Sequence, residues 1–416
     1  MGSAGERKRV LIIVQNLPVP FDRRVWLEAT TLQQSGYTVS VISPKAEGFD
    51  RSYELFEGVH IHRYSLPIEA RRKVGYVAEF AYCFLRTLGK SLRIAIRGPG
   101  FDVIQACNPP DTYWAIGLFW RLFGKRFVFD HHDLSPEMYA VKFGRSAGLI
   151  PSVLTFLERM SFRTADVAIA TNESHRRIAI QRGGMEPDQV FVVRSGPDLE
   201  RLTVYPGDEA WKRGREHLLV YLGEMCEQDG VEYLVRGVEH LRRDFERDDV
   251  HCVLVGGGPH QERIRAYAAE RGVSELCTFT GRVSDEVLCR VLSSADLAVD
   301  PSPKTPWSDR STMNKVMEYM FFGLPIVCFD LAENRYSAQE AAVCAESNDP
   351  LALAACINRL LDDPARRARM SEYGQRRVRE ELAWRYSAPH LLAAYETVLP
   401  RGSAARTRYS FISPST

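Results

Sequence analysis

Short runs of apolar, often β-branched residues alternate along the chain with longer segments whose apolar positions recur at helical spacing. In the first half these runs occupy residues 9–15, 38–43, 59–64, 103–106, 126–130, 167–170 and 190–193, and residues 24–34 form the first helical segment. In the second half they recur at 217–222, 251–255, 277–280, 297–300 and 326–329. Strands that alternate with helices pair in parallel through crossover connections. The pattern therefore predicts an α/β fold with two doubly wound, Rossmann-like sheets that face each other across a cleft.

A break in this alternation divides the chain. Ser195-Gly196-Pro197-Asp198 opens a polar stretch that ends near residue 215. We therefore predict an N-terminal domain over residues 1–197 and a C-terminal domain over residues 198–385. Leu391, Leu392 and Tyr395 stand at helical spacing, which predicts a helix over residues 386–400 that packs back on the rest. The tail 401–416 consists mostly of small and polar residues, and its start resembles a protease-site linker. We therefore expect it to be disordered and leave it out of the predicted fold.

Composition narrows the class of protein. The 416 residues are 45% hydrophobic and 26% charged, which is average for a globular protein, and the net charge of +1 provides no global field for nucleic acid. No apolar run approaches the roughly 18 residues of a membrane helix, and no signal peptide precedes the first strand. Nine cysteines without a C-x-x-C pair indicate neither a disulfide framework nor a zinc site. We expect a cytoplasmic protein.

One segment leaves a membrane contact open. Residues 71–97 combine seven basic side chains with four aromatic ones. A helix of this composition can lie on an anionic bilayer, but it can equally be a solvated helix that covers the sheet. Peripheral attachment at the inner face of the membrane therefore stays an alternative, and the oligomeric state is not predicted.

Three loops of the second half follow predicted strands, where ligands bind in open parallel sheets. Gly256-Gly257-Gly258-Pro259 brings bare amides and a helix start together, which suits a phosphate, although a tight turn explains the same residues. Gly281-Arg282-Val283-Ser284 precedes a helix from Asp285 and could pair with the edge of a nucleobase.

The third loop carries the most chemistry. We expect Ser311 or Thr312 to cap a helix that starts near Met313, where free amides suit a diphosphate. Lys315 adds a positive charge one turn inside, and Glu318 can accept from the two hydroxyls of a ribose. The alternative is a simple i, i+3 ion pair between Lys315 and Glu318.

In the first half, the run 126–130 ends in Asp130-His131-His132-Asp133. Ionisable side chains at the end of a central strand are costly unless they are hydrogen-bonded or functional. We expect His132 to act on the sugar or the acceptor, with Asp133 fixing its orientation; a structural histidine and a metal ligand are the alternatives. The chain has no Asp-x-Asp motif, so amides, helix ends and cations must neutralise a leaving diphosphate. We expect no metal.

The blocks GGGP and STMNKVMEYMFFGLPIV, together with the two sheets, resemble the retaining family 4 glycosyltransferases of GT-B fold. NPPD, FDHHDLSPE and QDGV are similar to one branch of that family, and the likeness covers nearly the whole chain. It implies transfer of a sugar from a nucleotide-diphosphate donor of the UDP or GDP type to a small-molecule or lipid-linked glycan acceptor. The pathways implied are those of surface polysaccharides or specialised metabolites. The resemblance implies no cofactor for the enzyme. A sugar-nucleotide epimerase, a phosphorylase and a non-catalytic binder are the alternatives.

The resemblance assigns roles by position. Glu318 matches the second glutamate of the family's E-x7-E motif, but the first falls on Arg310, and Glu224 and Asp229 stand where an Arg and a Lys are common. Pro20-Phe21-Asp22 replaces the frequent Gly-Gly. For the diphosphate we therefore nominate Arg194, Arg310 and Lys315.

The predicted site thus comprises three sets. The catalytic residues are His132, Lys315 and Glu318. The donor site is expected to hold Gly256, Gly257, Arg282, Val283, Arg194, Arg310, Ser311, Thr312, Asn314, Lys315 and Glu318. The acceptor site is expected to hold Asn16, Asp22, Arg24, Asn108, Asp133 and Glu137.

Overall fold

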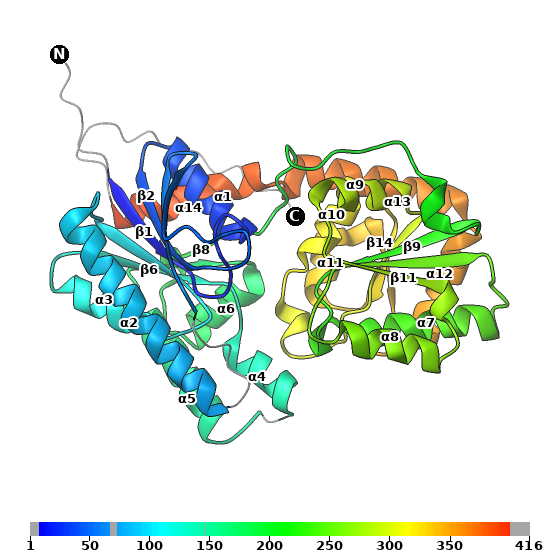
Figure 1. Ribbon diagram of the computed structural model, residues 1–416, viewed down its shortest axis with the longest axis horizontal. Coiled ribbons are helices and arrows are strands. Elements are labelled where there is room, and N and C mark those ends of the chain that lie inside the picture. Colours follow the sequence, from blue (N-terminus) through cyan, green and yellow to red (C-terminus); the bar gives the residue numbers. More distant parts are fainter. Residues whose placement is uncertain (1–7, 67–72, 145, 400–416) are drawn as a thin grey trace, which may run out of the picture.

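The computed structural model describes residues 8–66, 73–144 and 146–399. It shows two α/β domains side by side, each an open sheet with helices on both faces (Figure 1). This confirms the predicted fold class. The tail 401–416, together with Arg71 and Arg72 of the basic segment, lies outside the described residues.

The N-terminal sheet has eight strands in the order β3-β4-β2-β1-β5-β6-β7-β8. Neighbours pair in parallel except β3 and β4, which are antiparallel. The strands are β1 (Arg9–Ile13), β2 (Thr38–Pro44), β3 (Tyr53–Phe56), β4 (Val59–Tyr64), β5 (Val103–Cys107), β6 (Arg126–His131), β7 (Val167–Ala170) and β8 (Val190–Val192). Sequence analysis missed β3, because this short edge strand exposes most of its side chains and has no buried apolar run.

The C-terminal sheet has six parallel strands in the order β11-β10-β9-β12-β13-β14. They are β9 (His217–Leu222), β10 (Val250–Val255), β11 (Cys277–Gly281), β12 (Leu297–Asp300), β13 (Ile326–Phe329) and β14 (Ala342–Ala345). The edge strand β14 was also missed, since its small residues lack a strong β pattern.

Fourteen α-helices connect and cover the strands in the described part of the chain. They are α1 (Arg23–Gln34), α2 (Lys73–Arg97), α3 (Trp114–Arg121), α4 (Ser135–Phe143), α5 (Leu149–Thr164), α6 (Glu173–Gln181), α7 (Val231–Asp244), α8 (Gln261–Glu270), α9 (Asp285–Ser294), α10 (Asn314–Phe321), α11 (Ala332–Ala338), α12 (Pro350–Leu361), α13 (Pro364–Arg377) and α14 (Trp384–Val398). None of them has both the length and the apolar character needed to cross a bilayer.

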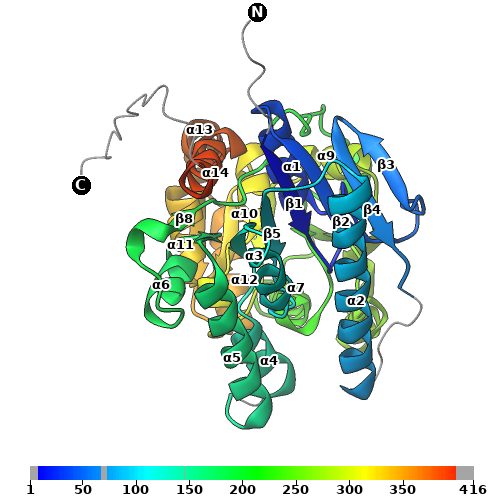
Figure 2. The same ribbon diagram turned by 90° about the vertical axis from the view of Figure 1, so that its left-hand side faces the viewer.

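Alternating side chains of the central strand divide the N-terminal core into two layers. Val10 and Ile12 pack under α1 and α14, whereas Leu11 and Ile13 pack under α2, α3 and α5. Figure 2 shows α2, α3 and α5 together on the surface turned away from the C-terminal domain.

Helix α14 returns from the C-terminal domain and completes the N-terminal core. Leu391, Tyr395 and Val398 are buried there, and the Tyr395 hydroxyl donates to Gln105 Oε1 of β5 at 2.5 Å. In Figure 1 this helix runs along the N-terminal domain. The predicted crossing helix is therefore present and begins two residues earlier than expected.

Candidate functional site

The carboxyl ends of both sheets approach each other at the boundary between the domains. Hydrogen bonds and ion pairs cross this boundary: Arg23 with Asp285 and Glu318, Asn172 with Thr312, Glu137 with Arg310, and Ser174 and Arg194 with Glu333. Most of these residues follow a strand or begin a helix. The boundary therefore brings the predicted loops of the two domains together.

A buried network surrounds Asp130 at the end of β6. Its Oδ2 lies 2.7 Å from His132 Nε2 and 2.7 Å from Gln105 Nε2, and its Oδ1 accepts from Arg24 at 3.1 Å. Gln105 also donates to Glu28 Oε2 at 2.6 Å. Since Asp130, Glu28 and Gln105 are fully buried, His132 is attached to a rigid polar core.

The two carboxyl groups of this network differ in charge. Burial and the neighbouring Asp130 raise the pKa of Glu28 well above its usual range, although Arg24 opposes this. Burial would also raise the pKa of Asp130, but His132 and Arg24 lower it below its usual range. The directions of these two pKa shifts favour an ionised Asp130 beside a protonated Glu28.

The same group could hold a metal ion by composition. Ligand atoms of Glu28, Cys107, Asp130 and His132 lie within 4.8 Å of one another. However, both carboxylate groups already face donors, because Arg24 lies 3.1 Å from Glu28 Oε1 and Gln105 contacts each of the two. This arrangement is that of a hydrogen-bonded network in which Arg24 already pairs with both carboxyl groups.

His132 is not oriented as the sequence suggested. Its ring contacts Asp130 rather than Asp133, because residues two apart on an extended segment project to the same side. Asn108 instead holds the loop: its Oδ1 accepts from the His132 amide at 2.6 Å, and its Nδ2 donates to the Asp133 carbonyl at 2.7 Å. The expectation that Asp133 orients the ring was therefore wrong.

Lys315, on the first turn of α10, lies in a buried acidic setting. Its Nζ is 3.6 Å from Asp300 Oδ1 and 3.7 Å from Asp229 Oδ1, and it lies 4.6 Å from the centre of the Tyr221 ring. Within the described residues Nζ has no hydrogen-bond partner at normal distance, although only 10% of the side chain is exposed. Burial raises the pKa of Asp229 to about 6 even though Lys315 opposes it. The two carboxylates raise the pKa of Lys315 against the effect of burial, and no described residue accepts from its ammonium group at normal distance.

Glu318 contacts cations from outside its own helix. Arg23 and Arg201 both approach its Oε1, at 3.2 and 3.1 Å. Burial raises its pKa, and both arginines oppose this. Lys315 and Glu318 do not pair with each other in the described contacts, so the simple i, i+3 ion pair is not what the fold uses.

Close packing explains part of the glycine run Gly256-Gly257-Gly258, and the loop also leaves room for a ligand. A Cβ at Gly256 would stand 2.0 Å from the Gly223 carbonyl oxygen, and one at Gly258 would stand 2.7 Å from the Met225 backbone. A Cβ at Gly257 would come no closer than 3.3 Å to the side chain of Gln261 and 3.7 Å to Arg282. Two of the three glycines are thus required by the close approach of the loop after β9.

Two sequence families match the chain. A glycosyl transferase 4-like domain matches residues 22–196, and the domain of glycosyl transferases group 1 matches residues 216–363, so together they cover well over half of it. The chain belongs to the glycosyltransferases. The fold agrees, since residues 216–363 contain all six strands of the C-terminal sheet and residues 22–196 contain every strand of the N-terminal sheet except β1.

Relatives of this glycosyltransferase are identical to it at about a quarter of the aligned positions. It is 26% identical over 367 residues to a D-inositol 3-phosphate glycosyltransferase of Thermomonospora curvata, covering 82% of each chain. It is 29% identical to the MMP alpha-(1->4)-mannosyltransferase of Mycolicibacterium hassiacum, but this match covers 53% of the chain and only 51% of that relative.

Solved structures show the same architecture. A sucrose-phosphate synthase from Thermosynechococcus elongatus superposes with a TM-score of 0.76 at 19% identity, covering 94% of this chain and 99% of that one. The Anabaena protein HepE in complex with UDP-glucose superposes with a TM-score of 0.71 at 13% identity, covering 94% and 99%. At these identities the likeness establishes the GT-B fold.

The start of α10 in this glycosyltransferase differs from the expectation. The helix begins at Asn314, and its N-cap residue Met313 provides no side-chain hydrogen bond. Ser311 Oγ donates to the Trp307 carbonyl, and Thr312 Oγ1 accepts from Asn172 of the other domain. The prediction that Ser311 or Thr312 caps the helix was therefore wrong, because the loop before α10 is bound to its own turn and to the N-terminal domain.

The three nominated cations have different surroundings. Arg194 pairs with Glu333 at 3.1 Å and stacks on Tyr336, and Arg310 pairs with Glu137 at 3.2 Å. Both arginines join the two domains. Arg194 leaves its Nε without a partner but donates through Nη2 to Glu333 and Ser337, whereas the whole ammonium group of Lys315 lacks a hydrogen-bond partner in the described residues.

The remaining predicted donor and acceptor residues of the glycosyltransferase do not form one cluster. Arg282 stacks on Phe21 across the boundary at 5.3 Å, and Val283 is half-buried beside it. Asp22 is the N-cap of α1, accepting from the Val25 amide, whereas Asn16 is exposed.

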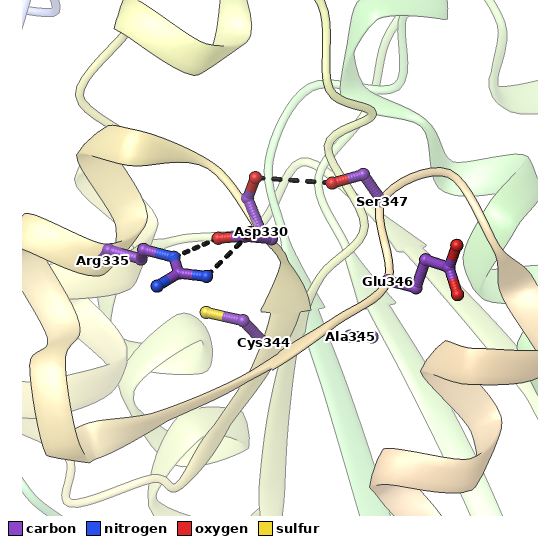
Figure 3. Close-up of a pocket in the computed structure, with 6 residues that line it drawn as sticks. All are labelled: Asp330, Arg335, Cys344, Ala345, Glu346 and Ser347. Atoms are coloured by element: carbon purple, nitrogen blue, oxygen red, sulfur yellow. Dashed lines mark hydrogen bonds and ion pairs between the residues drawn. The ribbon is translucent and has the colours of Figure 1, made fainter.

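One hollow lies outside the predicted site. It has about 440 Å³, and Figure 3 shows Asp330, Arg335 and Cys344 among its lining residues. It adjoins the ends of β13 and the edge strand β14, and Arg335 pairs with Asp330 across it. None of the predicted donor or acceptor residues lines it.

Sequence reasoning missed several residues that the fold places at the boundary. Arg23, Arg201, Asp300 and Asn172 all contact predicted residues. Asp300 ends a predicted strand, which could have singled it out. The others lack a local signal, because their partners are more than 20 residues away in the sequence.

Proposed function

We propose that this glycosyltransferase transfers a sugar from a nucleotide-diphosphate sugar, of the UDP or GDP type, with retention of anomeric configuration. The bond between the anomeric carbon and the β-phosphate oxygen breaks, a bond to an acceptor atom forms, and the acceptor proton leaves with the nucleoside diphosphate or to solvent. The buried ammonium of Lys315, which lacks a hydrogen-bond partner among the described residues, carries this proposal. A fixed cation in a desolvated site stabilises charge that develops on the leaving phosphate.

The surroundings of Lys315 support a role towards an anion. Asp229 and Asp300 keep the lysine protonated, because their carboxylates raise its pKa against the effect of burial. At 3.6 and 3.7 Å they are too far away to use its N–H donors fully. In place of the Arg and Lys that the resemblance led us to expect near Glu224 and Asp229, the positive charge comes from Lys315 of α10, which lies beside Asp229.

Glu318 has an oxygen left for a ribose. Arg23 and Arg201 both contact Oε1, and no described residue contacts Oε2 within hydrogen-bond distance. A ribose hydroxyl can therefore donate to Oε2 while the arginines remain in place. HepE is similar in fold and binds UDP-glucose, which supports a nucleotide sugar as the donor class here.

His132 and the N-terminal loops are proposed to receive the acceptor. The ring is only partly buried, and Asp130 holds its Nε2, so Nδ1 is the atom left for a sugar hydroxyl or an acceptor. We propose that the reaction needs no metal ion, because Lys315 and the backbone amides of Gly257 and the α10 start provide the compensating charge.

A donor panel tests this function. The full chain is incubated with UDP- and GDP-sugars, with and without glycan acceptors, and free nucleoside diphosphate and product configuration are measured. Acceptor-dependent release of the diphosphate with a retained anomer is expected. Epimerised sugar without release, transfer to phosphate, or binding without turnover would each refute the proposal in favour of an epimerase, a phosphorylase or a silent binder.

Matched variants connect the activity to the site. Glu318→Ala is expected to weaken nucleotide binding about tenfold through the lost ribose contact. Glu286→Ala, on the exposed surface of α9, is the control and should bind as the wild type does. Equal affinity in the two variants would move the ribose away from Glu318.

A further inference from the structure

Large apolar side chains are exposed in unusual number on one face of the N-terminal domain. Leu122 is 82% exposed, Leu149 81% and Ile96 77%, and Leu85, Phe123 and Phe156 are also more than half exposed. They belong to α2, α5 and the turn that ends α3. In the C-terminal domain, large apolar side chains exposed to this degree are limited to Val204 and Tyr336 among the described residues.

These residues share one surface. Helices α2, α3 and α5 cover the same side of the N-terminal sheet, where Cys83, Trp120 and Phe162 pack into one core cluster. The Trp120 indole donates to Ser91 Oγ, which joins α3 to α2. Figure 2 shows the three helices facing the viewer, on the side away from the C-terminal domain. We call this surface the α2–α3–α5 face.

The exposed apolar residues follow the outer line of each helix. On α5, Leu149, Val153 and Phe156 recur at intervals of three and four residues, opposite the buried Glu158 and Phe162. On α2, Leu85 and Ile96 lie opposite Cys83, Thr87 and Ile94, which are buried against the sheet. The outer line is therefore apolar although the inner side of each helix is already fully packed.

The charge on this face is strongly one-sided. The three helices contain eight basic and two acidic residues, in a chain whose net charge is only +1. One of the two acidic residues, Glu158, is fully buried and pairs with Arg182. Arg86, Arg93, Arg159 and Arg163 are exposed beside the apolar lines. The rest of the chain is correspondingly acidic.

We propose that the α2–α3–α5 face docks on an anionic lipid bilayer. Apolar side chains on a helix surface enter the boundary between headgroups and acyl chains, while adjacent arginines bind lipid phosphates. An apolar face of this extent without basic neighbours would fit a second copy of the chain, but a copy would bring the same positive charge against itself. The one-sided charge therefore selects the anionic bilayer. This docking does not depend on the identity of the donor or on sugar transfer.

Vesicle sedimentation with the full chain tests the docking. Vesicles of phosphatidylglycerol and phosphatidylcholine are compared with phosphatidylcholine alone, at 50 and 500 mM salt. The wild type should bind the anionic vesicles at least tenfold more tightly than the neutral ones, and high salt should weaken this binding. Equal binding to both kinds of vesicle, or no binding to either, would overturn the proposal.

Two variants locate the surface. Leu122→Glu with Phe123→Glu should reduce binding to anionic vesicles at least tenfold, while Leu351→Glu, an exposed apolar position on α12, should bind as the wild type does. Arg93→Ala with Arg163→Ala should reduce binding and flatten its salt dependence. Circular dichroism and thermal melts confirm folding. If Leu122→Glu with Phe123→Glu instead dissociates a dimer seen by light scattering without changing vesicle binding, the face is an interface between copies.

Discussion

Replacing the two buried carboxyl groups of the His132 network with amides gives a matched test of its charge state. Asp130 and Glu28 are both fully buried, and the change from carboxyl to amide is the same at each. Asp130→Asn removes a negative charge that faces His132, Gln105 and the buried Arg24. Glu28→Gln replaces a group that the network holds protonated.

The expected costs differ because only one of the two groups is charged. Breaking a buried ion pair typically costs 3–5 kcal/mol, and we expect about 3 kcal/mol for Asp130→Asn, since Glu28 can then ionise and pair with Arg24. Glu28→Gln loses at most one neutral hydrogen-bond partner, which is worth about 1 kcal/mol.

The dependence on pH has a definite sign. The folded chain keeps a proton on Glu28 that the unfolded chain releases above about pH 4.3, so this group's contribution to wild-type stability falls as pH rises. Glu28→Gln lacks that effect. Its free energy of unfolding should therefore rise relative to that of the wild type as the pH goes from 5 to 7. The pKa of Asp130 is lowered in the fold, so its stabilising contribution is complete over this range and is lost only at lower pH.

Urea denaturation followed by circular dichroism and tryptophan fluorescence measures both costs at pH 5 and pH 7. Coincident transitions of the two probes justify a single free energy of unfolding. If both variants lose about 3 kcal/mol, both carboxylates are ionised and the proposed charge state is wrong. If neither loses stability, Asp130 does not pair with Arg24 in solution.

The remaining predictions concern turnover and packing. His132→Ala should lower turnover about 10²-fold with nucleotide affinity nearly unchanged and a melting temperature only moderately lowered, since Asp130 keeps Arg24 and Gln105 as partners; a much lower melting temperature with a fully active folded fraction would make it a structural residue. Lys315→Ala should also lower turnover by about 10², whereas unchanged kinetics would mean that the lysine only neutralises its acidic neighbours. Gly256→Ala should destabilise the fold by about 2 kcal/mol or more, because φ is +123° and a Cβ would stand 2.0 Å from the Gly223 carbonyl oxygen, and a thermal melt comparable to the wild type would contradict the packing. Turnover should persist in excess EDTA; loss that magnesium or manganese restores would show that a metal takes part.

Local pattern determined the elements of this glycosyltransferase. The runs at 217–222, 297–300 and 326–329 coincide with β9, β12 and β13, because strands buried on both faces must be continuously apolar. The position of the site loops also followed from the sequence, since the carboxyl ends of parallel strands are the open end of such a sheet. Edge strands β3 and β14 escaped this reasoning, because neither needs a strong apolar run.

Which partner each ionisable side chain of the site contacts was decided only by the structure. Lys315 pairs with Asp229 and Asp300 rather than with Glu318, and His132 pairs with Asp130 rather than with Asp133. Each side chain had a charged neighbour nearby in the sequence, but the direction in which it projects depends on the strand or helix that carries it. The sequence by itself therefore determined which loops lie at the open ends of the sheets. Folding determined which further residues join them at the domain boundary and which side chains touch, because contacts between distant segments leave no periodic signal in a single chain.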